Sequence, residues 1–188
     1  MSIRFVTTHK KIHIAALWGL PDCGAPDAKT LFFDCYRAAV EAGKFPAGTE
    51  INFCIPAVSR GLFSAACEAK QAGLPVSRVI AACNENRVLT DFFRTGRYVP
   101  AQPARTDAPL LDVGAYPETA EIPEDARGLF AAYSIPARRR HNMAERVLAE
   151  YGVRLAPSTA AAYVALQDHR CVTADGLHAI LFALEEPE

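Results

Sequence analysis

The pattern of hydrophobic positions divides the chain into short continuous apolar runs and longer segments whose apolar residues recur at helical spacing. Apolar runs at Ile51–Ile55, Arg78–Cys83 and His178–Leu184 predict strands, and Ile12–Leu17 predicts a further short strand. Runs without regular polar alternation are typical of strands that are covered on both faces. The sequence therefore predicts a sheet buried between other elements.

Helices are predicted between these strands. Asp27 suits an N-cap, and Leu31, Phe32 and Cys35 continue on one helical face until Gly43. Further helices are predicted over 61–72, 86–95, 124–133 and 137–151, then from Pro157, while residues 99–123 are expected to be irregular. Alternating strands and helices with short connections favour parallel pairing and right-handed crossovers. The expected fold is α/β, with three α/β/α layers around a mainly parallel sheet.

Composition and charge limit the classes of function. Of the 188 residues, 51% are hydrophobic and 22% charged, so residues 1–188 are expected to form a single domain. A net charge of −1 gives no support for a nucleic-acid or membrane partner. The densest basic run, Arg138-Arg139-Arg140-His141, is interpreted as a solvated helix face rather than an anion patch. No apolar run reaches the length of a membrane span.

The cysteines and histidines bear on compartment and on metal binding. The six cysteines form no C-x-x-C pair, and Cys35, Cys54, Cys67 and Cys83 lie inside predicted elements beside apolar residues. The five histidines show no ligand spacing, so no metal site is expected. The opening stretch MSIRFVTTHKKIHIAALWGL has charges inside its apolar part, unlike a signal peptide. Buried thiols in a reducing cytoplasm are therefore predicted.

The stretch INFCIPAVSRGLFSAACEAKQAGLP (51–75) has the order of strand, tight turn and helix that phosphate-binding units use. It continues into NENRVLTDFFRTGRY (84–98), and then come DAPLLDV (107–113), APSTAAAYVAL (156–166) and FALEEP (182–187). Together these segments resemble the C-terminal half of threonine synthase, over roughly residues 28–188, with 1–27 poorly matched. The resemblance implies part of the large domain of the fold-type II enzymes that depend on pyridoxal phosphate (PLP).

The departures from that family fall at its cofactor motifs. In the turn from Pro56 to Leu62, Val58 stands at the family's glycine and Ser59 at its asparagine. A β-branched residue is a poor choice where φ > 0 or an open backbone is needed. The family's N-terminal half, with its Schiff-base lysine, has no expected counterpart, and none of the five lysines has an S-F-K-D-like context. We expect no bound cofactor and no catalytic residue, with PLP as the alternative.

A remnant ligand site is predicted where the strands end, because ligands bind there in open parallel sheets. Its candidate residues are Ser59, Arg60, Gly61, Asn84 and Asn86. A phosphate-type small molecule is the expected ligand, since helix N-termini and guanidinium groups bind anions. The alternative for Arg60, which we favour, is a surface arginine or an ion pair with Glu68 or Asp91. For Asn84 we favour a cap or turn role, and for Asn86 both readings stay open.

Three classes of function stay open. We favour a threonine synthase-like domain that has lost catalysis and acts as a binding or interaction protein. The second class is a divergent enzyme of amino-acid metabolism that binds PLP or phosphate and is completed by oligomerisation or a partner chain. The third is a piece without evolved activity.

Self-association as a homodimer, or a stable partner protein, is also expected. A domain that keeps only part of its family's fold exposes a sheet edge and apolar surface, here near Trp18 and the helices around Phe32 and Phe92. The alternative is that residues 1–27 fold over this edge.

Overall fold

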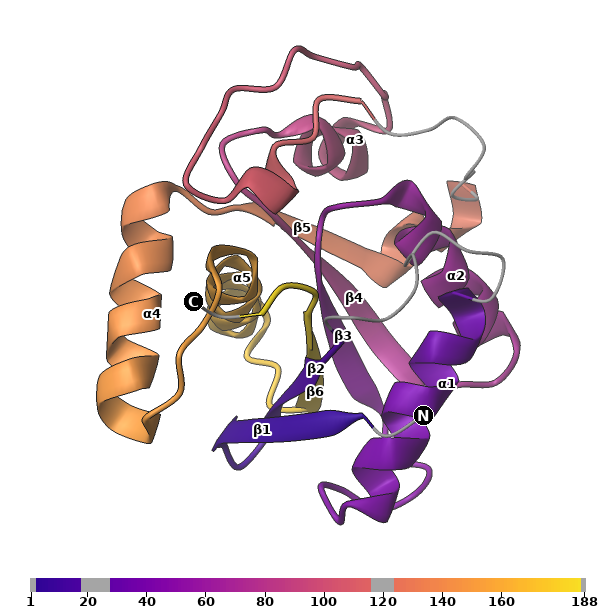
Figure 1. Ribbon diagram of the computed structural model, residues 1–188. Coiled ribbons are helices and arrows are strands. Elements are labelled where there is room, and N and C mark those ends of the chain that lie inside the picture. The colour runs from indigo at the N-terminus through magenta and orange to yellow at the C-terminus, as the bar shows by residue number, and fades with distance from the viewer. Residues whose placement is uncertain (1–2, 18–27, 116–123, 187–188) are drawn as a thin grey trace.

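The computed structural model describes residues 3–17, 28–115 and 124–186 (Figure 1). Within them, six strands form one sheet in the order β1-β2-β6-β3-β4-β5. The strands are β1 (Arg4–His9), β2 (Ile12–Ala16), β3 (Ile51–Pro56), β4 (Val76–Cys83), β5 (Phe130–Ser134) and β6 (His178–Ala183). The β1–β2 pair is antiparallel and the other neighbours are parallel. The predicted, mainly parallel sheet is confirmed.

Helices cover both faces of this sheet. On one face lie α1 (Ala28–Glu41), α2 (Arg60–Gln71) and α3 (Val88–Thr95), and on the other α4 (Ala137–Tyr151) and α5 (Pro157–Thr173). Figure 1 shows α5 between the sheet and α4. Two short 3-10 helices, η1 (Pro109–Leu111) and η2 (Glu124–Leu129), lie in the connections. The predicted three-layer α/β/α architecture is confirmed.

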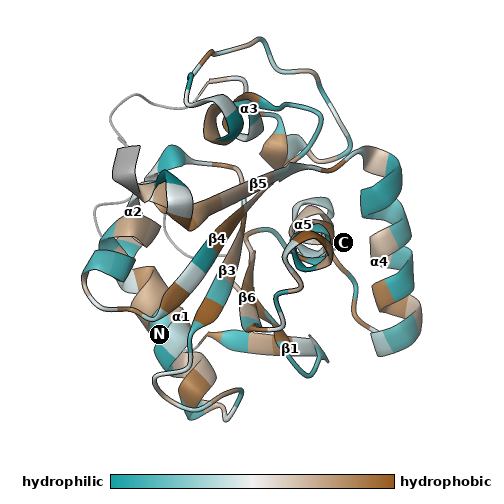
Figure 2. Cartoon of the chain, turned by 180° about the vertical axis from the view of Figure 1, so that it is seen from behind, coloured by the Kyte–Doolittle hydropathy of each residue, from teal (hydrophilic) through white to brown (hydrophobic). Residues whose placement is uncertain are grey.

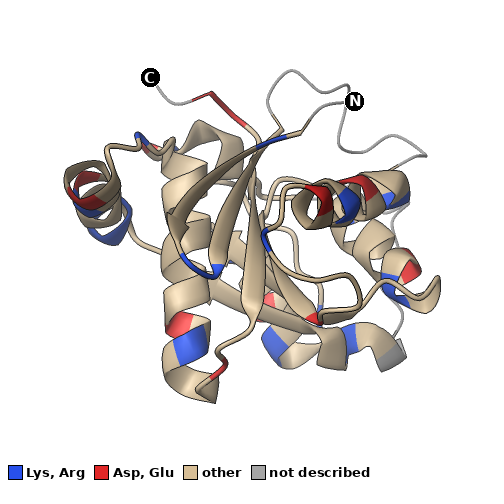
Figure 3. Cartoon of the chain, turned by 90° about the horizontal axis from the view of Figure 1, so that it is seen from below, with Lys and Arg blue, Asp and Glu red and all other residues tan. Residues whose placement is uncertain are grey.

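The sheet separates two hydrophobic cores, because successive residues of a strand point to opposite faces. In β3, Phe53 and Ile55 face the α1–α2 side, whereas Cys54 faces the α5 side. Phe182 of β6 meets Phe32 of α1 with their ring centroids 5.2 Å apart. Burying a side chain of this size contributes roughly 1.5–3 kcal/mol. The outermost helix, α4, is hydrophilic over much of its length (Figure 2), and Figure 3 shows the strands largely free of charged residues.

Most predicted elements are confirmed to within two residues at each end. Gly96 and Gly152 directly follow the helices predicted over 86–95 and 137–151, and in the structure they follow α3 and α4 with φ of 74° and 68°. This left-handed conformation is accessible to glycine without strain, and it terminates a helix by turning the chain away from its axis. The helix ends were therefore predictable from local sequence.

The helix predicted over 124–133 is wrong. Only the 3-10 helix η2 forms in its first part, and residues from Phe130 onward form β5, paired in parallel with Val79–Cys83 of β4. The segment FAAYS is short and contains alanines, which favour a helix in isolation. Pairing with the open edge of β4 supplies its backbone hydrogen bonds and overrides that local preference.

Strand β1 was missed because its sequence, RFVTTH, is mostly polar. It pairs with β2, and β2 pairs with β6, so this hairpin occupies the edge that the parallel strands alone would leave open. The alternative in which N-terminal residues fold over the sheet edge therefore holds for residues 4–16. The outer edge of the sheet on this side is β1.

Several expectations concern residues that lie outside the described ranges: the N-cap at Asp27, Cys23, and the apolar surface at Trp18. The irregular crossing expected over 99–123 is confirmed for residues 99–115, where η1 is the single short turn of helix. In the described part of the chain, no helix is long and apolar enough to cross a membrane.

Candidate functional site at the carboxyl edge of the sheet

The parallel strands end at one edge of the sheet, and α2, α3, α4 and α5 begin there. Helix α2 follows β3, α3 follows β4 and α4 follows β5, while the start of α5 lies beside the end of β6. All five candidate residues follow the ends of β3 and β4 at this edge. Ser59, Arg60 and Gly61 form the start of α2, while Asn84 and Asn86 form the turn before α3. Among the described residues, no hydrogen bond joins the two groups.

The β3–α2 turn uses its own backbone amides. The amide of Ala57 donates to the carbonyl of Ala82 at 2.9 Å, and that of Val58 donates to Pro56 at 2.8 Å. Ser59 is the N-cap of α2, and its hydroxyl accepts the amide of Gly61 at 3.1 Å. A phosphate cradle needs such amides free to point at the anion. Three amides of this segment are thus already bonded, that of Ala57 to β4 and those of Val58 and Gly61 within the turn.

Arg60 is buried, which neither sequence reading anticipated. Its side chain is 9% exposed, and its guanidinium carbon lies 4.9 Å from the ring centroid of Tyr98 and 5.9 Å from that of Phe92. The favoured interpretation, a surface arginine or an ion pair with Glu68 or Asp91, is therefore wrong. The contact is a cation–π stack. The Nε atom has no hydrogen-bond partner among the described residues.

Asn84 and Asn86 hold the loop that precedes η1. Asn84 accepts the amide of Asn86 at 2.9 Å, which is the predicted turn role, and donates to Asp112 at 2.7 Å and to Thr106 at 2.9 Å. Asn86 exchanges two hydrogen bonds with the backbone of Ala104, at 2.8 and 2.9 Å. Both amide side chains are thus engaged by the protein itself. The structure supports the turn interpretation for Asn84, whereas the side chain of Asn86 bonds a loop distant in sequence, and α3 has no side-chain cap.

A charge cluster around a buried arginine, beside this turn, was missed by the sequence analysis. Arg140, which was assigned to a solvated helix face, is fully buried. It donates to Glu85 at 2.9 Å and also contacts Asp107, while Glu85 accepts the amide of Ala137 at the start of α4 at 2.8 Å. No local pattern signals this cluster, because its members are 22 to 55 residues apart in the sequence.

The cluster sets the charge of its carboxylates. Burial acts to raise the pKa of Glu85, but hydrogen bonds from Ala137 and Arg140 outweigh it and hold that pKa below its ordinary value. The pKa of Asp107 is also lowered, since Arg140 outweighs the effect of burial there. Both side chains therefore stay ionised and fix the position of α4.

Candidate catalytic chemistry is sparse at this edge. Burial raises the pKa of the Cys83 thiol to about 11, so it is protonated and inert at neutral pH. Cys35, Cys54 and Cys67 are also buried free thiols, as predicted. No group of three or more His, Cys, Asp or Glu residues that suits a metal ion occurs in the described part of the chain.

The residues present do not fit PLP as the family's motif binds it. Val58 is partly buried against both hydrophobic cores, so its side chain fills space in the turn that a glycine leaves open. Of the lysines, Lys11 donates to the carbonyl of Gly176 at 2.6 Å and Lys70 donates to Val76. Lys10 and Lys29 are exposed in a turn and in the first turn of α1. The turn keeps the scaffold of a phosphate loop, with the amides of Ala57, Val58 and Gly61 bonded within the protein.

Comparison with known proteins agrees with the sequence resemblance. A family model described as pyridoxal-phosphate dependent enzyme matches residues 36–181. Threonine synthase-like 1 of Homo sapiens is 38% identical over 80 residues, which are 42% of this chain and 11% of that relative. Threonine synthase of Corynebacterium glutamicum is 40% identical over 67 residues, covering 34% of this chain and 14% of its own. The matched segments thus span a small part of these relatives.

Solved structures show the same fold. The PLP-bound threonine synthase from Brucella melitensis superposes with a TM-score of 0.69 at 21% identity, over 85% of this chain and 39% of that one. The yeast threonine synthase gives a TM-score of 0.69 at 16% identity, over 85% and 40%. At these identities the likeness concerns the fold alone. The predicted resemblance to part of a fold-type II enzyme is confirmed.

Proposed function

The chain belongs to the family of pyridoxal-phosphate dependent enzymes, and from this membership we propose that it is a threonine synthase-like member that has lost catalysis and acts by binding. The observation that carries the proposal is the β3–α2 turn, where the backbone amides of Ala57, Val58 and Gly61 all donate hydrogen bonds to other groups of the protein. A helix N-terminus attracts an anion through unpaired N–H groups, so a capped turn binds phosphate weakly.

The lysines support the same proposal. PLP chemistry requires an amine that forms a Schiff base and then moves protons. Lys11 and Lys70 are held by backbone carbonyls, and Lys44 lies near His13, whose pKa falls to about 4 chiefly through burial and partly through the neighbouring cations. None of these three amines lies at the β3–α2 turn. The four buried free thiols accord with a reducing, cytoplasmic environment for this function.

Incubation of the full chain with PLP tests the loss of catalysis. We expect no absorption band of a lysine adduct that survives gel filtration, and after borohydride reduction only low, scattered labelling of exposed lysines. The Lys11→Arg variant should label like the parent protein. A stoichiometric pyridoxyl label recovered on one lysine by peptide mass mapping would overturn the proposal.

A second candidate, a divergent enzyme that keeps a phosphate-type ligand, draws on Arg60. This side chain is nearly buried at the start of α2, and its Nε lacks a partner among the described residues. A guanidinium can replace lost amides as an anion partner. A helix N-terminus contributes about 0.3–1 kcal/mol and a charge-assisted hydrogen bond roughly 1.5–3 kcal/mol, so affinity for phosphate alone is millimolar to high micromolar at best.

Calorimetry with inorganic phosphate distinguishes the two candidates. The enzyme candidate requires phosphate binding that weakens about tenfold or more in Arg60→Met. Arg94→Met is the matched control, because Arg94 is exposed on α3 and paired with Asp91 at 3.0 Å. No binding, or binding that both variants weaken equally, favours the non-catalytic protein.

Self-association, or a stable partner chain, belongs to the same proposal. An open sheet edge favours pairing with another chain, and the open edge here is β1, whose outer side has no strand partner within the described residues. Sedimentation velocity at micromolar concentration should give a dimer of the 20.4 kDa chain. A monomer that does not associate up to high concentration would remove this part of the proposal.

A further inference from the structure

The antiparallel hairpin of β1 and β2 joins the rest of the sheet through a single strand, β6 (Figure 1). We call this contact, between Ile12–Ala16 and Ala179–Ala183, the β2–β6 seam. Side chains add to it at the hairpin turn, where the Lys11 ammonium group donates to the carbonyl of Gly176 at 2.6 Å. Folded proteins open locally in units that often coincide with supersecondary motifs. A hairpin attached along one seam is such a unit.

Two histidine rings meet at this seam, one from each strand. The Nε2 atom of His13 in β2 lies 3.1 Å from the Nδ1 atom of His178 in β6, and the rings stack with their centroids 5.4 Å apart. Phe45 packs against both rings, at centroid distances of 5.9 and 5.3 Å. His13 is only 1% exposed. At this distance one nitrogen donates and the other accepts, so the contact requires that only one of them carries a hydrogen.

The charged side chains that act on this pair are positive. Lys44 and Arg170 act on His13, and Lys11 and Arg170 act on His178. Each of these cations disfavours a further positive charge on the rings. Among the described residues, no carboxylate forms a hydrogen bond or an ion pair with either ring.

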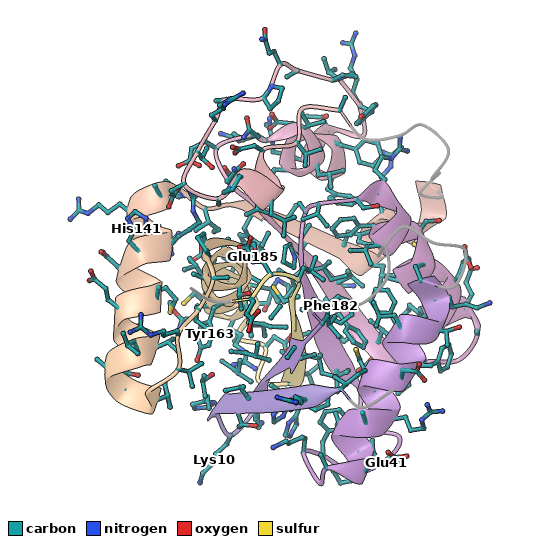
Figure 4. The ribbon with its side chains drawn as sticks, viewed as in Figure 1. Lys10, Glu41, His141, Tyr163, Phe182 and Glu185 are labelled. Carbon is teal, nitrogen blue, oxygen red and sulfur yellow. The ribbon has the colours of Figure 1, made fainter. Side chains whose placement is uncertain are left out.

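The other groups around the pair are neutral or point elsewhere. From β1, the Thr7 hydroxyl lies 3.4 Å from Nδ1 of His13. From α1, the Tyr36 hydroxyl is engaged with the carbonyl of Thr49 at 3.0 Å. Lys10, in the hairpin turn, is exposed and points away from the sheet (Figure 4). A proton taken up by the two rings is therefore not balanced by a negative charge from these elements.

The buried His169 of α5 provides a contrast. Its Nε2 atom lies 3.7 Å from the carboxylate of Asp175. Burial lowers the pKa of His169, but Asp175 acts in the opposite direction. A proton bound there has a counter-charge, which the pair at the β2–β6 seam lacks within the described residues.

We propose that the β2–β6 seam is a pH-sensitive joint, at which proton uptake by His13 and His178 releases the β1–β2 hairpin while the rest of the sheet stays folded. In the attached hairpin the rings share one hydrogen bond and stay uncharged. In the released hairpin they are surrounded by water, which solvates their charged forms. Release also frees the edge of β6, whose backbone groups then become available for pairing. The joint does not depend on whether the β3–α2 turn binds a ligand.

The sign of the pH dependence follows from the pKa values of the two rings. Burial, then His178 and the neighbouring cations, lower the pKa of His13 from 6.5 to about 4, and burial with Lys11 and Arg170 lowers the pKa of His178. The released state therefore binds more protons below about pH 6.5. The attachment of the hairpin is complete above that pH and weakens as pH falls toward about 4.

Native-state hydrogen exchange of the full chain at about pH 7.5 and about pH 5, corrected for the intrinsic pH dependence of amide exchange, tests the proposal. We expect the opening equilibrium of residues 4–16 to rise about tenfold or more on acidification, because one extra proton in the released state changes it by about tenfold per pH unit. Strands β3 and β4 should change less than about threefold. Glu85 and Asp107, whose pKa values are lowered, stay ionised over this range and do not contribute.

Variants of two histidines in the same hairpin assign the response. His13→Phe removes the titrating ring but keeps an aromatic side chain beside Phe45, so the rise in hairpin opening should be about threefold or less. His9→Gln is the matched control, because His9 is an exposed histidine of β1, and it should keep the rise of the parent protein. Should His13→Phe fail to fold, His13→Gln removes the same titrating group and has the same expected result.

The proposal is overturned if the opening equilibrium of residues 4–16 rises by less than about tenfold between the two pH values, or if it rises by more than about threefold in His13→Phe. An equal rise for β3 and β4 overturns it too, because the acid response then belongs to the whole molecule. Loss of the rise in His9→Gln would assign the response to an exposed histidine instead of the pair.

Discussion

Helices α2 and α5 start at the same edge of the sheet, on opposite faces, and differ in how their first turns are satisfied. Helix α2 is capped by its own neighbour, since the Ser59 hydroxyl accepts the amide of Gly61. Helix α5 has no such cap, and Glu185 reaches its Ser158 amide from beyond the end of β6. Beside that carboxylate lies a cavity, whereas the turn before α2 is filled by Val58.

The difference shows that a helix N-terminus at the carboxyl edge is not by itself a ligand site. What matters is whether side chains of the protein already use the amides and fill the space in front of them. In this chain the helix start that corresponds to the family's phosphate loop is occupied. The helix start that the family resemblance does not mark as a ligand site leaves the Thr159 hydroxyl unpartnered within the described residues.

The largest expected effect concerns α4, which also starts at this edge and is held by ion pairs to the buried Arg140. Glu85→Gln combined with Asp107→Asn leaves Arg140, which is fully buried, without a carboxylate. We expect the free energy of unfolding in urea to fall by about 3–5 kcal/mol. An exposed pair on α3, changed by Arg87→Gln with Asp91→Asn, should cost less than about 1 kcal/mol. Equal losses in the two double variants would show that the burial of Arg140 adds nothing to the strength of its ion pairs.

The pH dependence of stability should distinguish the carboxylate of Glu85 at the start of α4 from the hydroxyl of Ser59 at the start of α2. The pKa of Glu85 and that of Asp107 are lower in the folded protein than their ordinary values of 4.5 and 3.8. The unfolded chain therefore binds protons first, so this stabilisation is present above those values and is lost as pH falls through the lower folded-state pKa values. Thermal unfolding followed from neutral to acidic pH should show a shallower acid slope in Glu85→Gln.

Ser59→Ala provides the control for that titration. It should lower stability at every pH without changing the slope, because a hydroxyl does not titrate in this range. A parallel change in slope in both variants would show that the acid sensitivity arises elsewhere in the molecule.

The caps of α2 and α5 themselves should have smaller effects. Ser59→Ala and Glu185→Gln are each expected to reduce the free energy of unfolding by about 0.5–2 kcal/mol. The Glu185 effect includes the attraction of a carboxylate to the helix dipole, so added salt should diminish it, while the Ser59 effect should be insensitive to salt. Denaturant unfolding at low and high salt measures both. An equal salt response would remove the distinction between the caps.

The smallest expected change comes from Thr159→Val. Because the Thr159 hydroxyl has no partner among the described residues, its removal should leave stability unchanged within about 0.5 kcal/mol or raise it slightly. Thr173→Val removes a hydrogen bond to the carbonyl of His169 at 2.8 Å and should be mildly destabilising. A loss above about 1 kcal/mol in Thr159→Val would indicate a structural role for this hydroxyl.

The sequence by itself determined the class of fold and most of its elements. Continuous apolar runs identified β3, β4 and β6, and glycines at positions 96 and 152 marked helix ends, because these signals depend on residues that are close in the chain. The same local analysis found that Val58 stands in the β3–α2 turn at the position where the family has a glycine. It also anticipated the turn role of Asn84, since an asparagine that follows a strand commonly accepts a nearby amide.

Tertiary structure alone decided the identity of β5, the burial of Arg60 and Arg140, and the cavity at α5. Each depends on partners distant in sequence: β4 for β5, Tyr98 for Arg60, Glu85 for Arg140 and Glu185 for the start of α5. Local propensity and composition describe the chain before these contacts form. An arginine in a basic run or a threonine in an alanine-rich helix acquires its environment only when separate elements meet, because burial removes water and leaves the protein to satisfy each polar group.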